Sequence, residues 1–332
     1  MRAEDVVVSG KKGECTDTLS VAVHLHVFYT DLIPEFVCCL ERVPRPFTLL
    51  ISVPQTVSMD DKEITASFRT LPHVQKTVVK RVPNRGRDIA PMVCSFADEI
   101  QQHDVLLHLH TKKSPHDVRQ KGWLEHILEH LLPSVAGTET LLCMMQRGAG
   151  IIVPPDFLYR IIPDGWFDKR NMLIAQQLLN RAELKTDLKE EYPEIDFPQG
   201  SMFWARTDYL KHFLDLGLTY EDFPAEPIGV DGTMAHALER LFFIWGRDSG
   251  MTPYRVYLTE QERTLTHRFM DMAHDLATER MQHTAVIEKL ERERSAFIKK
   301  NDKHLRWCRL LCAACVVLFV LLVTVCVVSY AL

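Results

Sequence analysis

The chain has no excess of basic residues. Its 332 residues include 39 lysines and arginines against 44 aspartates and glutamates, which gives a formal net charge of −5. Proteins that bind nucleic acid usually show the opposite balance, with basic residues gathered on one face. The sequence therefore predicts no nucleic-acid partner.

The chain also lacks a regular cysteine spacing and an apolar leader. Four of its 9 cysteines lie at or after Cys308 and the other five are scattered, which is not a disulfide framework. This pattern is typical of a reducing compartment. The segment from Met1 to Asp17 is polar, so we expect no signal peptide there.

One long segment has no charged residue at all, from Leu310 to Leu332. A helix of that length covers a hydrocarbon core of about 30 Å, whereas a buried core helix rarely lacks every polar anchor. Lysines and arginines precede it, and such an excess marks the cytoplasmic flank of a span: Lys299, Lys300, Lys303, Arg306 and Arg309. We expect a single-pass C-terminal anchor in membrane lipid, with the rest of the chain cytoplasmic.

The sequence divides into four parts on these grounds. We expect a polar N-terminal tail over 1–18, an α/β domain over 19–258, a charged helical spacer over 259–306 and the transmembrane anchor over 307–332. Charged residues interrupt the apolar repeat of the spacer, so a solvated stalk is favoured. A homodimer through 259–300 stays open.

Strands and helices alternate along the α/β domain. β-branched or apolar runs predict strands over Ser20–Phe28, Phe47–Val53, Val74–Val82, Val105–His110 and Gly150–Val153. Helical stretches lie between them, and the segment from Asp156 to Phe197 is less regular. The pattern predicts a Rossmann-like, mostly parallel sheet with flanking helices, whose ligands bind beyond the carboxyl ends of the strands.

Two polar clusters follow predicted strands. The first is Asn84, Arg85, Gly86, Arg87 and Asp88, in which two guanidinium groups suited to phosphate flank a flexible glycine. A solvated turn capped by Asp88 is the alternative.

The second cluster begins on a strand and continues where it ends. His108 and His110 share one face of the strand, and Lys112 and Lys113 follow it. Such cations could neutralise a diphosphate without metal. A charged loop after two ordinary strand histidines is the alternative.

Two further segments complete the candidate site. An aromatic-rich strand holds Gly200, Ser201, Phe203, Trp204 and Arg206, whose rings could pack on a sugar or simply fill the core. A later helix start presents acidic and basic groups: Glu226, Asp231, His236, Glu239 and Arg240. Asp231 could act as a base near the helix start, or serve only as a cap beside a surface salt bridge.

Five motifs in series carry a family resemblance. They are VAVHLHVFYTDLIPEF, VPNRGRDIAP, HLHTKKS, GSMFWAR and EPIGVDGTMAHALERLF. In this order and spacing they resemble the rhamnan synthesis protein F family, over about Ser20 to Met251. The resemblance implies a glycosyltransferase role in making rhamnose-containing cell-surface polysaccharide, with deoxythymidine-diphosphate rhamnose (dTDP-rhamnose) as the suggested donor.

A more distant resemblance is to the GT-A-type layout of nucleotide-sugar transferases. It places Asn84 and Gly86 in an N-x-G element and Gly200, Met202 and Arg206 in a G-x-M-x-x-x-R strand. Asp231 falls on the acidic position that holds the catalytic base. Where that class has a metal-binding D-x-D, this chain has His108-Leu109-His110. Histidine supplies no oxygen ligand for Mg²⁺, so we expect basic side chains to replace the metal, with no cofactor.

The leading hypothesis is transfer of a sugar from a nucleotide-diphosphate donor to a glycan or lipid-linked acceptor. Asp231 would remove the acceptor proton, oriented by His236, Glu239 and Arg240, while the cations stabilise the departing diphosphate. Two alternatives remain. One is a non-catalytic sugar-binding or scaffold module at the membrane. The other is a metal-dependent hydrolase using His24 and His26 with His108, His110 and Asp231.

Overall fold

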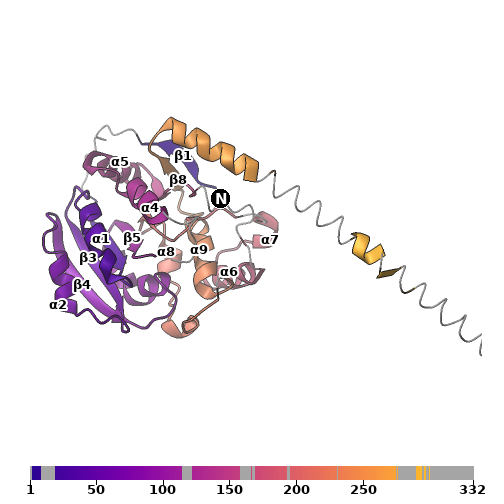
Figure 1. Cartoon of the computed structure of the whole chain (residues 1–332), viewed down its shortest axis with the longest axis horizontal. Coiled ribbons are helices and arrows are strands. Elements are labelled where there is room, and N and C mark those ends of the chain that lie inside the picture. The colour runs from indigo at the N-terminus through magenta and orange to yellow at the C-terminus, as the bar shows by residue number, and fades with distance from the viewer. Residues whose placement is uncertain are drawn as a thin grey trace, which may run out of the picture. The chain divides into compact units, whose positions relative to one another are not determined.

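The computed structural model describes residues 2–8, 19–113, 122–157, 166, 169–192, 195–229, 231–273, 275, 289–293, 295, 296 and 299. The chain forms two compact units, Met1–Asp271 and Met272–Leu332. All the elements discussed below belong to the first (Figure 1). The predicted anchor, 307–332, lies outside the described residues. Among those that are described, no helix has both the length and the apolar character to cross a bilayer.

A single eight-stranded sheet forms the centre of the first unit. Its strands stand in the order β1 (Glu4–Val7), β8 (Thr252–Tyr257), β6 (Ala149–Val153), β7 (Phe203–Arg206), β5 (Val105–His110), β2 (Val21–His26), β3 (Phe47–Pro54) and β4 (Val74–Val82). Every pairing is parallel except those of β7, which runs antiparallel to both β5 and β6. The predicted α/β class with a mostly parallel sheet is confirmed.

Helices connect the strands. They are α1 (Ile33–Leu40), α2 (Asp61–Ser67), α3 (Ala97–Gln101), α4 (Trp123–Leu131), α5 (Val135–Gln146), α6 (Lys169–Arg181), α7 (Leu188–Glu191), α8 (Lys211–Leu214) and α9 (Met234–Trp245). Local signals set several starts: Asp60 and Glu63 form a capping box at α2, and Ser134 caps α5. The helical stretch between β4 and β5 is divided, because a π-helical turn, Pro91–Ser95, precedes α3.

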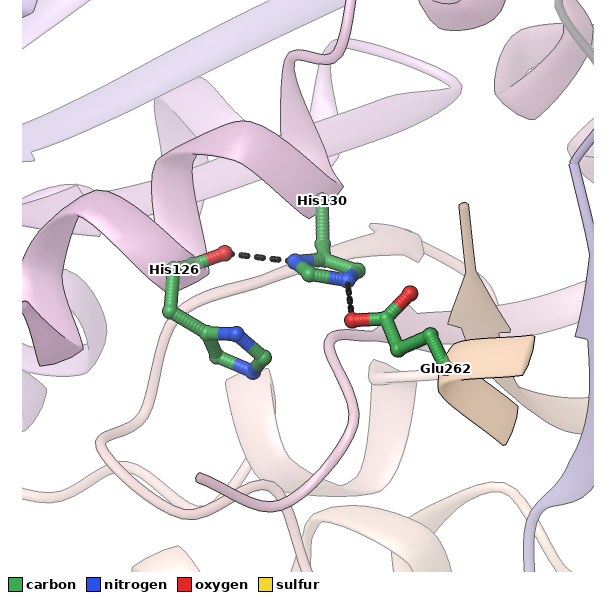
Figure 2. Close-up of side chains that lie close together, drawn as sticks. All are labelled: His126, His130 and Glu262. Carbon is green, nitrogen blue, oxygen red and sulfur yellow. Dashed lines mark hydrogen bonds and ion pairs between the residues drawn. The ribbon is translucent and has the colours of Figure 1, made fainter. Parts of the chain in front are cut away.

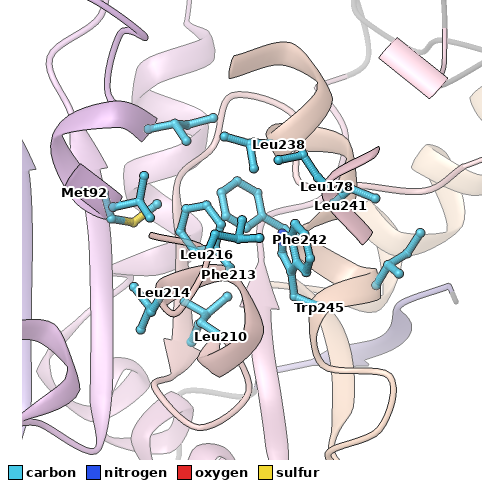
Figure 3. Close-up of a cluster of buried hydrophobic side chains, with 14 of the residues drawn as sticks. Met92, Leu178, Leu210, Phe213, Leu214, Leu216, Leu238, Leu241, Phe242 and Trp245 are labelled. Atoms are coloured by element: carbon cyan, nitrogen blue, oxygen red, sulfur yellow. The ribbon is translucent and has the colours of Figure 1, made fainter. Parts of the chain in front are cut away.

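The sheet is covered on both faces by separate apolar clusters. Along β2, Ala22 packs into one cluster, while Val21 and Val23 pack into the other. This is the period-two alternation of a strand buried on both sides. Figure 3 shows part of the first cluster, where Phe242 of α9 lies against Phe213 of α8 with ring centroids 5.5 Å apart. The histidines of β2 and β5 occupy even positions, and therefore share the face of Ala22.

The first unit is longer at both ends than the predicted domain. Residues Glu4–Val7, expected to be part of a polar tail, form β1 and pair with β8. Helical residues 260–271, expected to belong to the spacer, are part of this unit, and His267 Nε2 lies 2.5 Å from Asp5 Oδ2. The polar composition of β1 concealed it, because an edge strand can keep charged side chains.

The described cysteines differ in state. Cys38, Cys39 and Cys94 are free, whereas Cys143 on α5 is disulfide-bonded. The scattered spacing predicted no disulfide framework, so this bond departs from expectation. Spacing along the chain does not report which cysteines the fold brings together.

Candidate functional site

The sheet reverses its direction of growth between β2 and β5. From β2 the chain adds β3 and then β4 on one side, and it then returns to place β5 on the other side of β2. The segments that follow β2 and β5 therefore leave in opposite directions, and such a point is where open α/β sheets bind ligands. The Thr111 hydroxyl joins the two segments by accepting from the amides of Phe28 and Tyr29, at 2.8 and 2.9 Å.

A cavity of about 660 Å³ opens at this point. Its size is that of a pocket for a small organic ligand. Residues from all four predicted segments line it: Asn84, Arg87, Asp88, His110, Lys112, Lys113, Gly200, Ser201, Glu226, His236 and Glu239. The sequence clusters, far apart along the chain, therefore share one site.

Both signs of charge meet in the cavity wall. Arg87, Lys112 and Lys113 are the cations among its described residues, and Asp88, Glu226 and Glu239 are the carboxylates. Lys112 lies over the Trp123 ring, 3.9 Å from its centroid, and Lys113 pairs with Asp31. Arginine and lysine suit phosphate oxygens, while carboxylates accept from hydroxyl groups. The wall therefore offers partners for both anionic groups and hydroxyl groups of a ligand.

Backbone strain marks two residues of the wall. Arg87 and Ser201 adopt φ values of 55° and 57°, a region that non-glycine residues seldom occupy. Such strain costs about 1–3 kcal/mol per residue and gathers at binding and active sites. Its occurrence at two residues of the same wall supports a functional role for the cavity.

A buried chain of hydrogen bonds runs behind the wall. His26 Nδ1 lies 2.9 Å from Ser52 Oγ, and His24 Nε2 lies 3.0 Å from the same oxygen. His24 Nδ1 lies 2.9 Å from His108 Nδ1, and His108 Nε2 lies 3.1 Å from Asp88 Oδ2. The parallel register of β2 and β5 sets His24 beside His108 and thereby closes the chain.

One assignment of protons satisfies every link. His26 Nδ1–H donates to Ser52, Ser52 donates to His24, His24 donates to His108, and His108 donates to Asp88. All three histidines are neutral in this assignment. Burial lowers the pKa of His26 to about 3 and holds the pKa of His24 well below its usual value. Asp88 ends the chain as an ionised carboxylate: burial opposes ionisation, but its pKa is still lowered, and it accepts the hydrogen bond of His108.

Removing the central hydroxyl should destabilise the fold. Ser52→Ala deletes one atom and leaves no appreciable void, but it deprives His26 Nδ1 and His24 Nε2 of their shared partner. Two unsatisfied buried groups should lower the free energy of unfolding by about 2–4 kcal/mol. Urea unfolding curves measure this, with Ser67→Ala on the exposed side of α2 as a control expected within about 0.5 kcal/mol of wild type. An equal, small change in both variants would show that these buried hydrogen bonds through Ser52 are not formed.

His236 and Asp231 are arranged one behind the other. His236 lines the cavity, and its Nε2 is buried with no hydrogen-bond partner among the described residues. Its Nδ1 lies 2.8 Å from Thr233 Oγ1 and 3.9 Å from Asp231 Oδ1. Burial, followed by the charge of Arg87, lowers the pKa of His236. A neutral ring whose Nδ1–H donates to Thr233 Oγ1, with the Asp231 carboxylate nearby, leaves Nε2 able to accept a proton.

Asp231 is not part of the described cavity lining. Its carboxylate accepts from Asn171 Nδ2 at 2.9 Å and pairs with Arg240 at 3.2 Å. Arg240 is buried behind the wall, so it supports Asp231 rather than touching a ligand. Glu239 does line the cavity, and its Oε1 accepts from the amide of Gly200 at 2.9 Å.

The model of the family described as rhamnan synthesis protein F matches residues 3–251. The chain belongs to this family. It is 30% identical over 250 residues to the uncharacterized protein WxcX of Xanthomonas campestris pv. campestris, and 29% identical to WxcX of strain B100. Each match covers 74% of this chain and 34% of the relative, so the chain spans about a third of the length of these curated relatives.

Two residues of this rhamnan synthesis family member that were predicted to bind the sugar donor have a structural role in the backbone instead. Arg85 NH1 donates to the carbonyls of Tyr220 and Phe223, at 3.3 and 3.4 Å, and Arg85 is absent from the cavity lining. Gly86 adopts φ +65°, and a Cβ there would lie 2.4 Å from the Cβ of Ala90. Both residues shape the turn that presents Asn84, Arg87 and Asp88.

The predicted sugar-stacking strand requires a correction. Phe203 and Trp204 are fully buried on opposite faces of the sheet, and the Trp204 indole donates to Leu131 O. Neither ring has a face available to a sugar. Arg206 pairs with Asp208 and stands beside Val105, at the start of β5. Because β7 is antiparallel, Arg206 lies at the edge of the sheet opposite the cavity, and only the start of this segment, Gly200 and Ser201, reaches it.

Sequence reasoning missed the part of the wall that follows β2. Phe28 and Tyr29 line the cavity beside Thr111, as does His26, which the sequence offered only as a metal ligand. All three lie in the first family motif, but their residue types do not by themselves indicate a phosphate or sugar site. The signal that could have found them is strand adjacency, because a parallel pairing of β2 with β5 places both carboxyl ends together.

The metal-hydrolase alternative finds no support in the positions of its residues. Both nitrogens of His24 are engaged, by His108 and Ser52. Among the described residues, one group of side chains lies close enough to share a metal ion, and it is His126, His130 and Glu262. His24, His26, His108, His110 and Asp231 do not form such a group.

Proposed function

We propose that the protein is a glycosyltransferase of rhamnan synthesis, with a nucleotide-diphosphate sugar bound in the cavity at the switch point. The observation that carries the proposal is the convergence on one cavity of Arg87, Lys112 and His236, from three distant segments. Membership of the rhamnan synthesis protein F family supports polymer synthesis as the setting, and dTDP-rhamnose as the donor.

The transfer breaks the bond between the sugar's anomeric carbon and the donor diphosphate, and forms a bond from that carbon to an acceptor oxygen. Arg87 and Lys112 would stabilise the negative charge that develops on the departing diphosphate. His236 Nε2 would take the acceptor hydroxyl proton, and Asp231 would stabilise the resulting imidazolium. In this arrangement the base is His236, which lines the cavity, and not Asp231, which the sequence predicted for this role.

The remaining carboxylates suit the neutral part of the ligand. Glu226 and Glu239 line the cavity and can accept from sugar hydroxyls, with Gly200 and Ser201 beside them. The basic side chains take the place of a metal in the proposal. In this proposal, a membrane anchor at 307–332 would hold the enzyme near a lipid-linked acceptor and raise the local concentration of both.

Donor binding tests the charge assignment. The melting temperature of the purified full chain should rise with dTDP-rhamnose, and the rise should persist in EDTA. Arg87→Met and Lys112→Met should each weaken donor binding by about tenfold or more, because each removes a charged partner of the diphosphate. Titration calorimetry measures the dissociation constants.

The matched control is Arg69→Met, an exposed arginine outside the cavity, which should bind as wild type does. Binding that vanishes on chelation would contradict the metal-free arrangement. Binding without turnover, across a range of acceptors, would favour the non-catalytic module instead.

A further inference from the structure

His126, His130 and Glu262 form a cluster that the proposed reaction does not use. The histidines lie four residues apart on one face of α4, and Glu262 comes from the helical residues 260–273 that follow β8. One ligand atom from each side chain lies within 4.8 Å of the others. Figure 2 shows the three side chains turned toward one another.

Backbone carbonyls fix the tautomer of both rings. His126 Nε2 lies 2.9 Å from Pro155 O, and His130 Nδ1 lies 2.6 Å from His126 O. A carbonyl only accepts, so each of these nitrogens must carry a proton. The other nitrogen of each ring, Nδ1 of His126 and Nε2 of His130, then has a lone pair when the ring is neutral. A ring N–H held by a carbonyl is the usual support of a metal-binding histidine.

The cluster brings acceptors together. His130 Nε2 lies 2.7 Å from Glu262 Oε1, and both atoms are acceptors when the ring is neutral and the carboxylate is ionised. The carboxylate is held in place because its Oε2 accepts from the amide of Leu258 at 2.8 Å. Only a proton or a metal cation between His130 and Glu262 makes their contact favourable.

We propose that His126, His130 and Glu262 bind one Zn²⁺ ion. Two imidazole nitrogens and one carboxylate oxygen are a zinc donor set, whereas Mg²⁺ and Ca²⁺ prefer oxygen alone. Bonds of about 2.0–2.2 Å place tetrahedral ligand atoms about 3.3 Å apart, so His130 and Glu262 would separate slightly and His126 would approach. The fourth position would be filled by water.

The ion would join two parts of the first unit. It would fasten residues 260–271 to α4. The first residue of α4 is Trp123, and Lys112 of the cavity wall lies over the ring of Trp123. Zinc at this place would therefore restrain a helix that supports the cavity without entering it. The inference concerns metal binding alone and stands apart from the proposed reaction.

Zinc titration of the full chain, purified in mild detergent and stripped with chelator, tests the site. A competing zinc indicator should report about one tightly bound Zn²⁺ per chain, and the melting temperature should rise with zinc and fall again with EDTA. His126→Gln and Glu262→Gln should each weaken zinc binding by at least about tenfold. The two substitutions lie on different elements, so one remains informative if the other unfolds the protein.

His212→Ala is the matched control, a partly exposed histidine on α8 that should leave zinc affinity unchanged. Absence of stoichiometric zinc would mean that a proton holds His130 to Glu262, and would overturn the proposal. So would zinc binding that survives both glutamine substitutions, because the ion would then lie elsewhere in the chain.

Discussion

Replacing His236 by glutamine should lower kcat for sugar transfer by about 100- to 10,000-fold, the usual contribution of a positioned general base. Glutamine keeps a polar side chain of similar length but cannot take a proton at neutral pH. The donor dissociation constant should change little, because the phosphate partners Arg87 and Lys112 are untouched. Initial rates with dTDP-rhamnose and a glycan acceptor measure kcat, and calorimetry measures donor binding.

Asp231→Asn separates the base from the residue behind it. If His236 takes the proton, the asparagine variant should lose about tenfold in kcat, because Thr233 still holds Nδ1 and only the charge that favours the imidazolium is removed. It should also shift the lower limb of the pH–rate profile, because the carboxylate favours the protonated ring. A larger loss in Asp231→Asn than in His236→Gln would return the role of base to Asp231.

The sequence predicted the sheet well because its strands are buried on both faces. Continuous apolar runs such as Phe47–Val53 have few other structures open to them, and the structure places strands there. The short edge strand β1 was missed because its exposed positions carry charge. Helix α6 was missed within the segment described as less regular.

The predictions for the candidate site also differ in outcome, depending on whether they rested on strand position or on side-chain type. Residues directly after strands, such as Asn84 and Lys112, reach the cavity, as expected for carboxyl ends that meet at one edge. Residues predicted from their chemical type alone include two that do not reach the cavity. Trp204 has the right ring for a sugar but lies in the core, and Arg206 has the right charge but belongs to the one antiparallel strand. Strand direction and burial depend on the whole fold, and a motif does not encode them.

The buried histidines also make acid lability an expected result. His24 and His26 have pKa values far below the unfolded value of 6.5, chiefly through burial, with the value for His26 at about 3. Below pH 6.5 the unfolded chain therefore binds protons that the folded chain does not, and stability falls as pH falls. Together the two histidines should reduce the free energy of unfolding by about 4 kcal/mol between pH 7 and pH 5.

Other buried groups also contribute to the pH dependence of stability. Burial likewise lowers the pKa values of His110 and His236 and adds to the loss. Asp88, whose pKa is lowered, contributes stability that is present above the unfolded value of 3.8 and is lost only below it. Asp156 has the opposite sign, because burial raises its pKa and favours the protonated folded form.

Urea unfolding at pH 7, 6 and 5 measures the acid effect. His26→Gln should reduce the loss across this interval by about 2 kcal/mol, because one proton-binding difference disappears. This comparison is independent of the variant's absolute stability, which also suffers from the lost contact with Ser52. His212→Ala should retain the wild-type pH dependence. Stability that stays level from pH 7 to pH 5 would mean that the histidines of β2 are protonated in the fold, and the hydrogen-bond chain ending at Asp88 would have to be redrawn.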